Sequence, residues 1–497
     1  MTQKGYMNDF YKQFEELKLE IENSKNLPRV ERRKKERKLQ KKYNDKSIRI
    51  IGNKSFKKSK EFNRETRRQL IKDKNLVKEI VRIIRKYFPL LDDIISNLTD
   101  KRNQSYITYN MKSIIYTKLF ALLCGITTMT DISDENNFDS KETIDFISQL
   151  SNQRLTEIPY WQTIQDVIEQ LDIEEIRNIR KYMVRALIRS KMFYKYRHNE
   201  YWQLLVDATG ISSHNYNLNG TCIYKKSKNG VMKYYKYALE AKIVVGNIVI
   251  SLDTEWIENI EINNEKQKQD CEINAFKRMA PRIYKEYPKM KLIITGDALY
   301  ATEPTIDICN KYKWKYIFNL KKDRLKQIYN DFEDDLSYEN ETNKENYFLS
   351  TKINYKNHNI NALRYQEYQK DKKTKENKLI KFNYITNLKV NNHNIEKIVK
   401  LGRKRWKIEN EGFNVQKNGI FHISHLCSRN ENAIKIHYYL IQIAHIIRQL
   451  LEYGSILLSS MKLKTKKEVS NTIFKTLTSS YTNLNNIETK FQLRFDT

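Results

Sequence analysis

Three acidic residues lie where they could hold divalent metal ions. Asp207 ends the apolar run Tyr201–Asp207, and Asp297 ends a similar run that begins at Lys291. Each run predicts a β-strand, and a strand that closes on an aspartate presents the carboxylate at the edge of a sheet rather than in its core. A buried, unpaired carboxylate is costly, so each aspartate needs hydrogen bonds, a cation or a metal ion. Either aspartate alone is equally consistent with an ordinary turn, but together with Glu409, far along the chain, they favour a metal site.

Glu409 lies in a segment, residues 403–417, whose spacing predicts a helix. At about 100° per residue, Arg405 and Glu409 lie about 40° apart and share a face, and Gln416 lies within about 20° of Arg405. Glu411 points well away from them. Glu409 is therefore the better candidate for a ligand and Glu411 the alternative, although an Arg–Glu surface pair is the ordinary interpretation of such a helix by itself.

The charge of the chain indicates a polyanionic partner. Its 497 residues include 91 Lys or Arg and 60 Asp or Glu, for a formal charge of +31. Such an excess favours nucleic acid through attraction and counterion release. Part of it is also typical of an AT-rich genome, because Lys, Asn, Ile and Tyr are all abundant. Its distribution is more informative: between Arg29 and Lys74 there are 20 Lys or Arg and 6 Asp or Glu, which places +14 in one stretch.

The order of predicted elements around the two aspartates indicates a mixed α/β core. After the Asp207 strand, Tyr235–Trp256 predicts two strands joined by a tight turn at Gly246 and Asn247. A helix, the Asp297 strand, a short helix and a fifth strand follow, near 264–287, 291–297, 303–312 and 314–320. This order, with acids ending strands one and four, predicts an RNase H-like fold with a mixed five-stranded sheet and flanking helices.

The regions outside this core differ in pattern. Apolar residues recur at helical spacing in Glu65–Phe88, Lys112–Leu123 and Pro159–Lys191. These helices could form a helix-turn-helix or a packed spacer. After the fifth strand, alternating runs predict either a β-rich insertion or a separate small domain. The helix Ile434–Leu450 is apolar nearly all round, which is typical of a core or a partner interface.

We therefore expect six segments along the chain. They are a basic helical DNA-binding region at 1–104, a second helical region at 105–198, the catalytic core in two parts at 199–332 and 396–460, a β-rich insertion at 333–395 between these parts, and a C-terminal tail at 461–497. The second part of the core carries the helix with Glu409.

Neither a membrane segment nor a cysteine framework is evident. No run of about 18 apolar residues could span a bilayer, and the first 20 residues are polar rather than a signal peptide, so we expect a cytoplasmic, nucleoid-associated protein. The five cysteines are scattered and odd in number, which argues against both disulfides and a zinc finger. They are Cys124, Cys222, Cys271, Cys309 and Cys427.

The chain resembles a known family, the insertion-sequence DDE transposases that carry a Tyr-x2-Arg-x3-Glu-x6-Lys signature and a β insertion before the glutamate. The resemblance covers roughly residues 112–451. It is most specific in four motifs: LLVDATG at Leu204–Gly210, SLDTEWIEN at Ser251–Asn259, GDALYA at Gly296–Ala301 and RWKIENEGFN at Arg405–Asn414.

The resemblance implies Asp207, Asp297 and Glu409 as the catalytic residues and metal ligands. It also implies Arg405 as the signature arginine, which holds a phosphate near the scissile bond. Two positions depart from the signature. Gly402 stands where the tyrosine is expected and Gln416 where the lysine is expected, with Lys417 one residue beyond, so the phosphate contacts of those two side chains do not carry over directly.

The family chemistry explains why carboxylates are needed. Breaking and rejoining phosphodiesters requires an activated oxygen nucleophile and charge relief at phosphorus, which two divalent ions about 3.5–4 Å apart supply. Mg²⁺ (or Mn²⁺) prefers oxygen ligands. The resemblance implies that Asp207 bridges the ions while Asp297 and Glu409 each hold one. Metal-activated water would nick double-stranded DNA at the inverted-repeat ends of an element, and the freed 3′-hydroxyl would join target DNA, in a synaptic homodimer.

Other candidates are weaker. Five lysines between the first two strands could contact the DNA backbone or form a solvated hairpin: Lys225, Lys226, Lys228, Lys233 and Lys236. His214 follows the first aspartate by seven residues, but a single histidine is more often structural. His422 and His425 are only loosely spaced like a ligand pair and lack companions at zinc spacing. We expect Trp406 and Phe413 to anchor their helix in the core.

Three other functional classes stay open. A hydrolytic nuclease or resolvase of the same fold would use the same acids without joining ends. A relative that binds DNA without cutting would have lost an acid, and all three are present here. A basic structural DNA-binding protein would not require these acids.

Overall fold

The computed structural model describes residues 74–134, 138–259, 269–338, 346–370, 376–485, 487 and 491–495. The chain divides into two compact units, Met1–Lys72 and Asp73–Thr497, and every described residue belongs to the second. The predicted basic stretch therefore lies, except for Lys74, outside the described residues.

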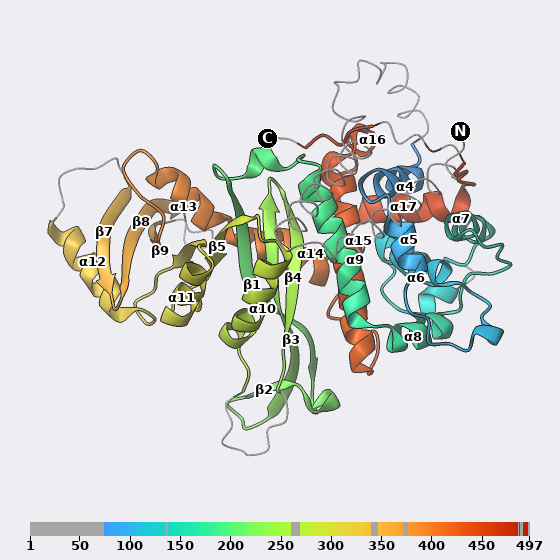
Figure 1. Cartoon of the computed structure of the whole chain (residues 1–497), viewed down its shortest axis with the longest axis horizontal. Coiled ribbons are helices and arrows are strands. Elements are labelled where there is room, and N and C mark those ends of the chain that lie inside the picture. The colour runs from blue at the N-terminus through green and yellow to red at the C-terminus, as the bar shows by residue number, and fades with distance from the viewer. Residues whose placement is uncertain are drawn as a thin grey trace, which may run out of the picture. The chain divides into compact units, whose positions relative to one another are not determined.

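A group of helices precedes the sheet in the described chain (Figure 1). It consists of α4 Leu76–Tyr87, α5 Leu91–Ser96, α6 Met111–Cys124, α7 Lys141–Ser151, α8 Trp161–Gln170 and α9 Ile173–Arg189. The predicted helix Pro159–Lys191 is two helices, because Leu171 and Asp172 adopt extended backbone angles. The Asp172 side chain then caps α9 by accepting a hydrogen bond from the Glu174 N–H at 2.8 Å.

Helix α15, Glu431–Gly454, joins these helices to the sheet. Nearly all of its residues are buried, and it packs against α4, α6, α8 and α9 on one side and strand β4 on another. The prediction that this apolar helix forms core is confirmed. Helix α17, Lys466–Ser479, lies in the segment expected to be a tail and packs against α4, α6 and α7. No helix among the described residues is long and apolar enough to cross a membrane.

Among the described residues, nine strands form one mixed sheet. They are β1 Tyr201–His214, β2 Ile223–Lys226, β3 Met232–Val245, β4 Ile248–Ile257, β5 Lys291–Gly296, β6 Lys315–Asn319, β7 Tyr347–Tyr355, β8 His358–Lys370 and β9 Asn377–Thr386. The sheet order is β2-β3-β1-β5-β6-β9-β8-β7, and β4 also pairs with β3. The pairs β3–β4 and β1–β3 are antiparallel, whereas β1–β5 and β5–β6 are parallel. This arrangement is consistent with an RNase H-like DDE domain.

The β-rich insertion extends the sheet and is not a separate domain. Strand β9 pairs antiparallel with β6, and β8 and β7 follow outward. Helix α12, Lys326–Tyr338, packs against β7 and was not predicted. The expectation of five strands therefore accounts for β1, β3, β4, β5 and β6 only.

Strand β1 is longer than predicted. It runs seven residues past Asp207 to His214 and stays paired with β3, with a bulge between Gly210 and Ser212. The prediction that Asp207 ends its strand is wrong. Gly210 lies at this bulge, where an added Cβ would be in ordinary contact with the ring of Tyr237 on β3 at 3.5 Å. By contrast, the predicted turn at Gly246 is confirmed, and its φ of +62° suits glycine.

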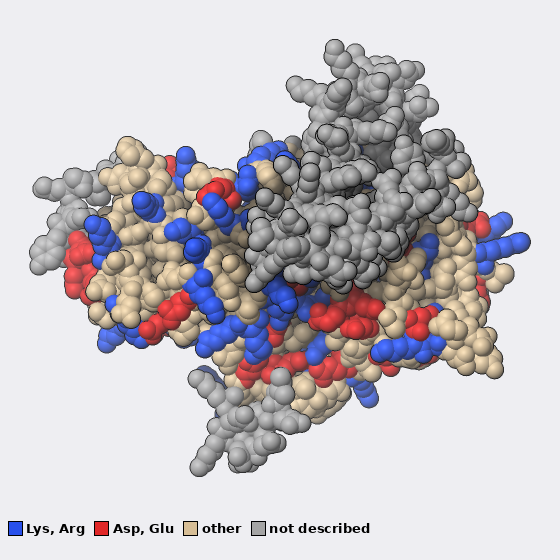
Figure 2. All heavy atoms as spheres, in the orientation of Figure 1, with Lys and Arg blue, Asp and Glu red and all other residues tan. Residues whose placement is uncertain are grey.

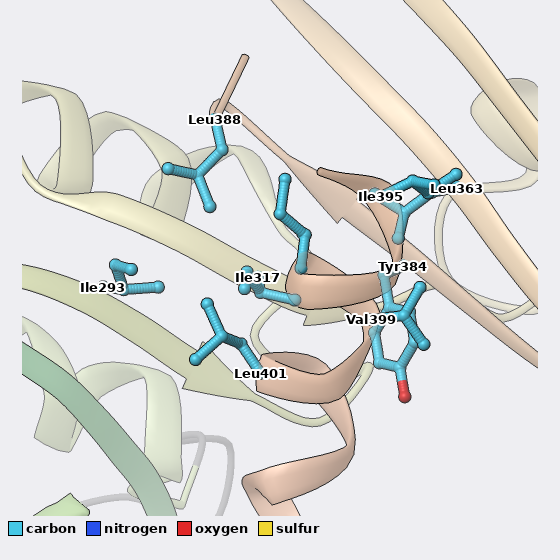
Figure 3. Packing of buried hydrophobic residues seen from close by; sticks show 9 residues of the cluster. Ile293, Ile317, Leu363, Tyr384, Leu388, Ile395, Val399 and Leu401 are labelled. Atoms are coloured by element: carbon cyan, nitrogen blue, oxygen red, sulfur yellow. The ribbon is translucent and has the colours of Figure 1, made fainter. Parts of the chain in front are cut away.

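An apolar cluster fixes the insertion and the following helix on strands β5 and β6 (Figure 3). Ile293 on β5 and Ile317 on β6 belong to the same buried cluster as Leu363 and Tyr384 of the insertion. Helix α13, Ile395–Arg403, contributes several further side chains, including Leu401. The segment that follows α13 and carries Glu409 therefore starts from a fixed point on the sheet.

A buried polar network ties the Glu409 segment to α9. The Gln416 side chain donates a hydrogen bond to Gln442 at 2.9 Å, and the Lys242 ammonium donates to the same Gln442 oxygen at 2.8 Å. Lys242 also forms an ion pair with Glu240 at 3.2 Å. Both charged side chains are fully buried, and burial lowers the pKa of Lys242 while Glu240 opposes that shift.

The network continues toward α9 through hydroxyl groups. Ser251 donates a hydrogen bond to Glu240 at 2.7 Å and accepts one from Arg180 at 3.1 Å. Arg180 also pairs with Asp253 at 3.2 Å. Because buried charges require partners, this network specifies how α9, the sheet and α15 fit together.

Replacing Lys242 by Met is expected to lower the free energy of unfolding by about 3–5 kcal/mol, because it leaves the Glu240 carboxylate buried without its ammonium partner. Denaturant unfolding would measure the change. Lys277→Met, at an exposed position of helix α10, Glu272–Glu286, serves as the control and should change stability by less than about 0.5 kcal/mol. Equal stability of the Lys242 variant and the wild type would contradict this account of the network.

Candidate functional site

The register of the sheet brings the two aspartates together. Strands β1 and β5 run parallel with Leu205 opposite Thr295. Asp207 and Asp297 each lie two residues further along, so they occupy matching positions on neighbouring strands, whose axes are about 4.8 Å apart. Asp297 directly follows β5, as predicted. Its carboxylate accepts a hydrogen bond from the Leu299 N–H at 2.8 Å, and that of Asp207 accepts one from the Ala208 N–H at 3.0 Å.

The segment that carries Glu409 is not a regular α-helix. A 3₁₀ turn at Lys404–Trp406 leads into a π-helix at Ile408–Phe413, followed by the short helix α14 at Asn414–Lys417. The face assignments based on 100° per residue assumed a regular helix, so their premise is wrong. Single π turns inside helices are common at functional sites because they redirect side chains.

The π-helix is held against the sheet by apolar contacts. Ile408 and Phe413 belong to one buried cluster with Leu205, Val244 and Val249 of strands β1, β3 and β4. Gly412 lies against the same surface, where an added Cβ would be in ordinary van der Waals contact with the Lys242 side chain at 3.4 Å and with Val249 at 3.5 Å.

Glu409 and Glu411 have different electrostatic neighbours. The charge of Glu409 acts on Asp207 and on Lys417. The charge of Glu411 acts instead on Tyr453 of α15. The helical angles that suggested Glu409 do not apply, and its role as a ligand stays a prediction.

Burial and like charges strain the Asp207 carboxylate. Burial raises the pKa of Asp207 to about 6, the Arg405 guanidinium opposes this, and the negative charges of Asp297 and Glu409 add to the rise. The distance from Arg405 Nη1 to Asp207 Oδ2 is 3.6 Å. Burial and nearby negative charge both disfavour an ionised carboxylate, so a cation is the natural further partner.

A fourth carboxylate, that of Glu272, belongs to this group and was missed. Glu272 is the first residue of helix α10, Glu272–Glu286. Burial, together with the negative charges of Asp207 and Asp297, raises its pKa to about 7. Its carboxylate accepts a hydrogen bond from the Tyr300 hydroxyl at 3.0 Å. The sequence offers only an acid near a helix start, although Tyr300 itself lies in the GDALYA motif.

The donor set suits a hard divalent cation. Carboxylate oxygens are the ligands that Mg²⁺ and Mn²⁺ prefer, and the mutual repulsion that raises the pKa of Asp207 would be relieved by such an ion. In the described part of the chain, no three His, Cys, Asp or Glu side chains are close enough together to form a ready-made metal site.

The predicted basic residues fall into two groups. Lys417 is half-buried beside Glu409 and Asp207, and burial lowers its pKa. Lys225, Lys226 and Lys233 are exposed on strands β2 and β3, and Lys228 is exposed between them. Figure 2 shows Lys and Arg across the middle of the face in view with Asp and Glu among them, so this face is mixed rather than uniformly basic.

Lys225 and Lys236 differ in what they contact. The Lys225 ammonium lies 5.6 Å from the ring centre of Tyr235 and 5.5 Å from that of Tyr237, and its charge acts on Glu272. Lys236 is buried, with its ammonium 3.4 Å from a carboxylate oxygen of Glu431 and also bonded to a threonine hydroxyl. We therefore do not retain Lys236 as a DNA contact.

The weaker histidine candidates do not join the carboxylates. His214 lies seven residues beyond Asp207 on the same strand, roughly 20 Å away at the rise of a β-strand, and bonds to Ser212 at 2.8 Å. His422 and His425 are exposed and share a backbone hydrogen bond. The described residues offer them no third ligand for a metal.

The structure shows how the side chains of Phe413, Trp406 and Gln416 are buried or exposed, and what surrounds Gly402. Phe413 is buried as expected, but Trp406 is 52 % exposed, so its prediction as a core anchor is wrong. At Gly402 an added Cβ would lie 2.6 Å from the Tyr384 ring, which fills the available space. Gln416 is fully buried and bonds to Gln442 and His445, so it cannot reach a phosphate.

All five cysteines are free; Cys124, Cys222 and Cys309 are buried and Cys271 is exposed.

Comparison with known protein families covers most of the described chain. A family model described as "Transposase DDE domain" matches residues 198–447, just over half of the 497 residues. A second model, described as "DDE_Tnp_1-associated", matches residues 93–183, which include α6 to α8 and most of α9. No curated protein is similar enough to the chain to count as a match.

Asp207→Asn is expected to raise the free energy of unfolding of the metal-free protein by roughly 2 kcal/mol at pH 8, because the folded state holds this carboxylate ionised at a cost. In the wild type, the protonated Asp207 carboxyl avoids this cost. This advantage is complete below about pH 4 and is lost as the pH rises through about 6. The gain should therefore vanish near pH 4. Denaturant unfolding with a chelator at both pH values would measure it.

Asp323→Asn, at an exposed position, is the control and should show no such pH-dependent gain. An Asp207→Asn variant as stable as the wild type at both pH values would contradict the electrostatic account of the site.

Proposed function

Because the chain belongs to the transposase DDE domain family, we propose that it nicks the ends of a mobile element and joins the freed 3′-hydroxyls to target DNA. Membership of this family implies an enzyme that binds DNA and acts on its phosphodiester bonds. The finer proposal concerns which residues do so and in which steps.

The proposal rests on one observation above all. The register of β1 and β5 puts Asp207 and Asp297 at neighbouring positions, and the charges of Asp297 and Glu409 both act on Asp207. These relations support the proposal that three carboxylates from distant parts of the sequence act together.

Asp207, Asp297 and Glu409 would hold two divalent ions, Mg²⁺ or Mn²⁺. Once bound, such ions activate an oxygen nucleophile and neutralise charge at the phosphorus that it attacks. Water is the nucleophile in the nicking step, and the 3′-hydroxyl is the nucleophile in joining. The nicking step cleaves one phosphodiester bond with water, and the joining step exchanges one phosphodiester bond for another. Neither step therefore requires an energy cofactor.

Arg405 and Lys417 supply positive charge beside the carboxylates. Arg405 is largely buried next to Asp207, and its Nε has no hydrogen-bond partner among the described residues. A guanidinium in this setting suits a phosphate oxygen near the scissile bond. Lys417 lies close enough to Glu409 and Asp207 for their charges to act on it, and in our proposal it contacts the same DNA strand.

Exposed lysines on the β2–β3 hairpin extend the proposed DNA surface. Lys225 on β2 is paired with Lys233 on β3, and Lys226 follows Lys225 on β2. Phosphate contacts by such side chains would strengthen binding to any duplex, with an affinity that falls as salt rises. Handling two element ends together requires two active sites, so a synaptic homodimer forms part of the proposal.

Strand transfer with purified protein, Mg²⁺ and labelled DNA carrying the ends that flank its gene tests the proposal. Joined products are expected from the wild type. Asp207→Ala, Asp297→Ala and Glu409→Ala should each reduce joining by roughly 100-fold or more, because each removes a group that acts in the transition state.

Glu411→Ala is the matched control, since Glu411 lies two residues from Glu409 and faces α15. Its joining activity should stay close to that of the wild type. Nicking without joining would favour a hydrolytic nuclease or resolvase over a transposase. An active Glu409 variant beside an inactive Glu411 variant would overturn the assignment of the third acid.

A further inference from the structure

The turn that follows Asp297 is closed by Tyr300. The Tyr300 N–H donates to the Asp297 carbonyl at 3.2 Å, while the Leu299 N–H donates to the Asp297 carboxylate at 2.8 Å. The position of the Asp297 carboxylate therefore depends on where this turn, and Tyr300 within it, is held.

The ring of Tyr300 is enclosed on several sides. It is fully buried, and it lies so close to Gly296 that an added Cβ there would be 2.7 Å from the ring. Phe276 of α10 meets it edge-on, with ring centres 6.0 Å apart, and Phe318 of β6 lies 6.4 Å away. These contacts fix the ring between β5, β6 and α10 and direct its hydroxyl to one partner.

That partner is Glu272, which accepts the hydroxyl hydrogen bond at 3.0 Å. Glu272 is largely buried and lies close enough to Asp207 and Asp297 for their charges to act on it. Burying a carboxylate beside two others is unfavourable unless a partner compensates it, and Glu272 accepts a hydrogen bond from the turn that carries Asp297.

We propose that Glu272 is a positioning residue that acts through Tyr300 to hold the Asp297 carboxylate beside Asp207, so that a divalent cation can bind there. This inference rests on the proposed function, because it assigns Asp297 as a metal ligand. It makes Glu272 a support for the ligand, in contrast to a fourth ligand that would contact the ion itself.

Two conservative variants separate these roles. Glu272→Gln keeps an oxygen that can accept the Tyr300 hydrogen bond but removes the charge. Tyr300→Phe keeps the enclosed ring but removes the donor. Both preserve side-chain volume, so the packing around Phe276 and Gly296 is retained, and thermal melting of the metal-free proteins would verify that they fold.

Mn²⁺ binding to the full-length variants, measured by calorimetry without DNA, provides the test. Tyr300→Phe and Glu272→Ala should each raise the Kd for Mn²⁺ by roughly 10–100-fold, the range found when a group that orients a ligand is removed. Glu272→Gln should stay within about 3-fold of the wild type. Glu272→Ala and Tyr300→Phe remove the same interaction. The double variant should therefore bind Mn²⁺ no more weakly than the weaker-binding single variant.

The opposite results would overturn the inference. Glu272→Gln as weak as Glu272→Ala would show that the charge of Glu272 matters by direct contact with the ion. Additive losses in the double variant would show that Glu272 and Tyr300 act independently, and unchanged affinity in all variants would show that neither positions a ligand. A wild type that binds no Mn²⁺ would overturn the proposed metal chemistry as a whole, whereas the other results would leave that chemistry standing.

Discussion

Mutual repulsion among buried carboxylates is the constraint on which this structure depends. Burial raises the pKa of Asp207 and of Glu272; the charges of Asp297 and Glu409 add to the rise at Asp207, and those of Asp207 and Asp297 add to the rise at Glu272. Arg405 offsets part of this charge from 3.6 Å. A fold that keeps such groups together gives up stability and gains a strong preference for cations. An enzyme that transfers phosphodiesters needs bound cations, because both its nucleophile and the phosphate that it attacks present oxygen atoms to the metal.

The surrounding fold supplies the rigidity that this arrangement requires. Parallel pairing of β1 with β5 sets the aspartates side by side, and the apolar cluster around Ile317 and Tyr384 fixes α13 at the start of the Glu409 segment. Beyond that segment, Gln416 is bonded into the buried network that reaches Arg180 on α9. The residues matched by the associated family model thus contact the catalytic sheet through buried charges, as well as through the apolar surface of α15.

The features that depend on a local pattern of residues could be predicted from the sequence. Alternating and apolar runs predicted the five strands that surround the aspartates, the turn at Gly246, and the β-rich insertion. Features that depend on tertiary pairing were not predictable. Asp207 lies within a strand because β3 continues to pair with β1 beyond it, and the π-helix lies where Ile408 and Phe413 pack on the sheet. The burial of Lys236 and the approach of Glu272 depend on partners far away in sequence, which no local spacing encodes.

The central claim is that one ion-binding site is made by Asp207, Asp297 and Glu409. A crystal of the protein soaked in Mn²⁺, with the metal located by anomalous scattering, tests this claim most directly. We predict peaks within coordination distance of all three carboxylates, with Asp207 between the two ions and Glu411 in contact with neither. Peaks that omit Glu409, or that lie on Glu411 or away from the β1–β5 edge, would contradict the account.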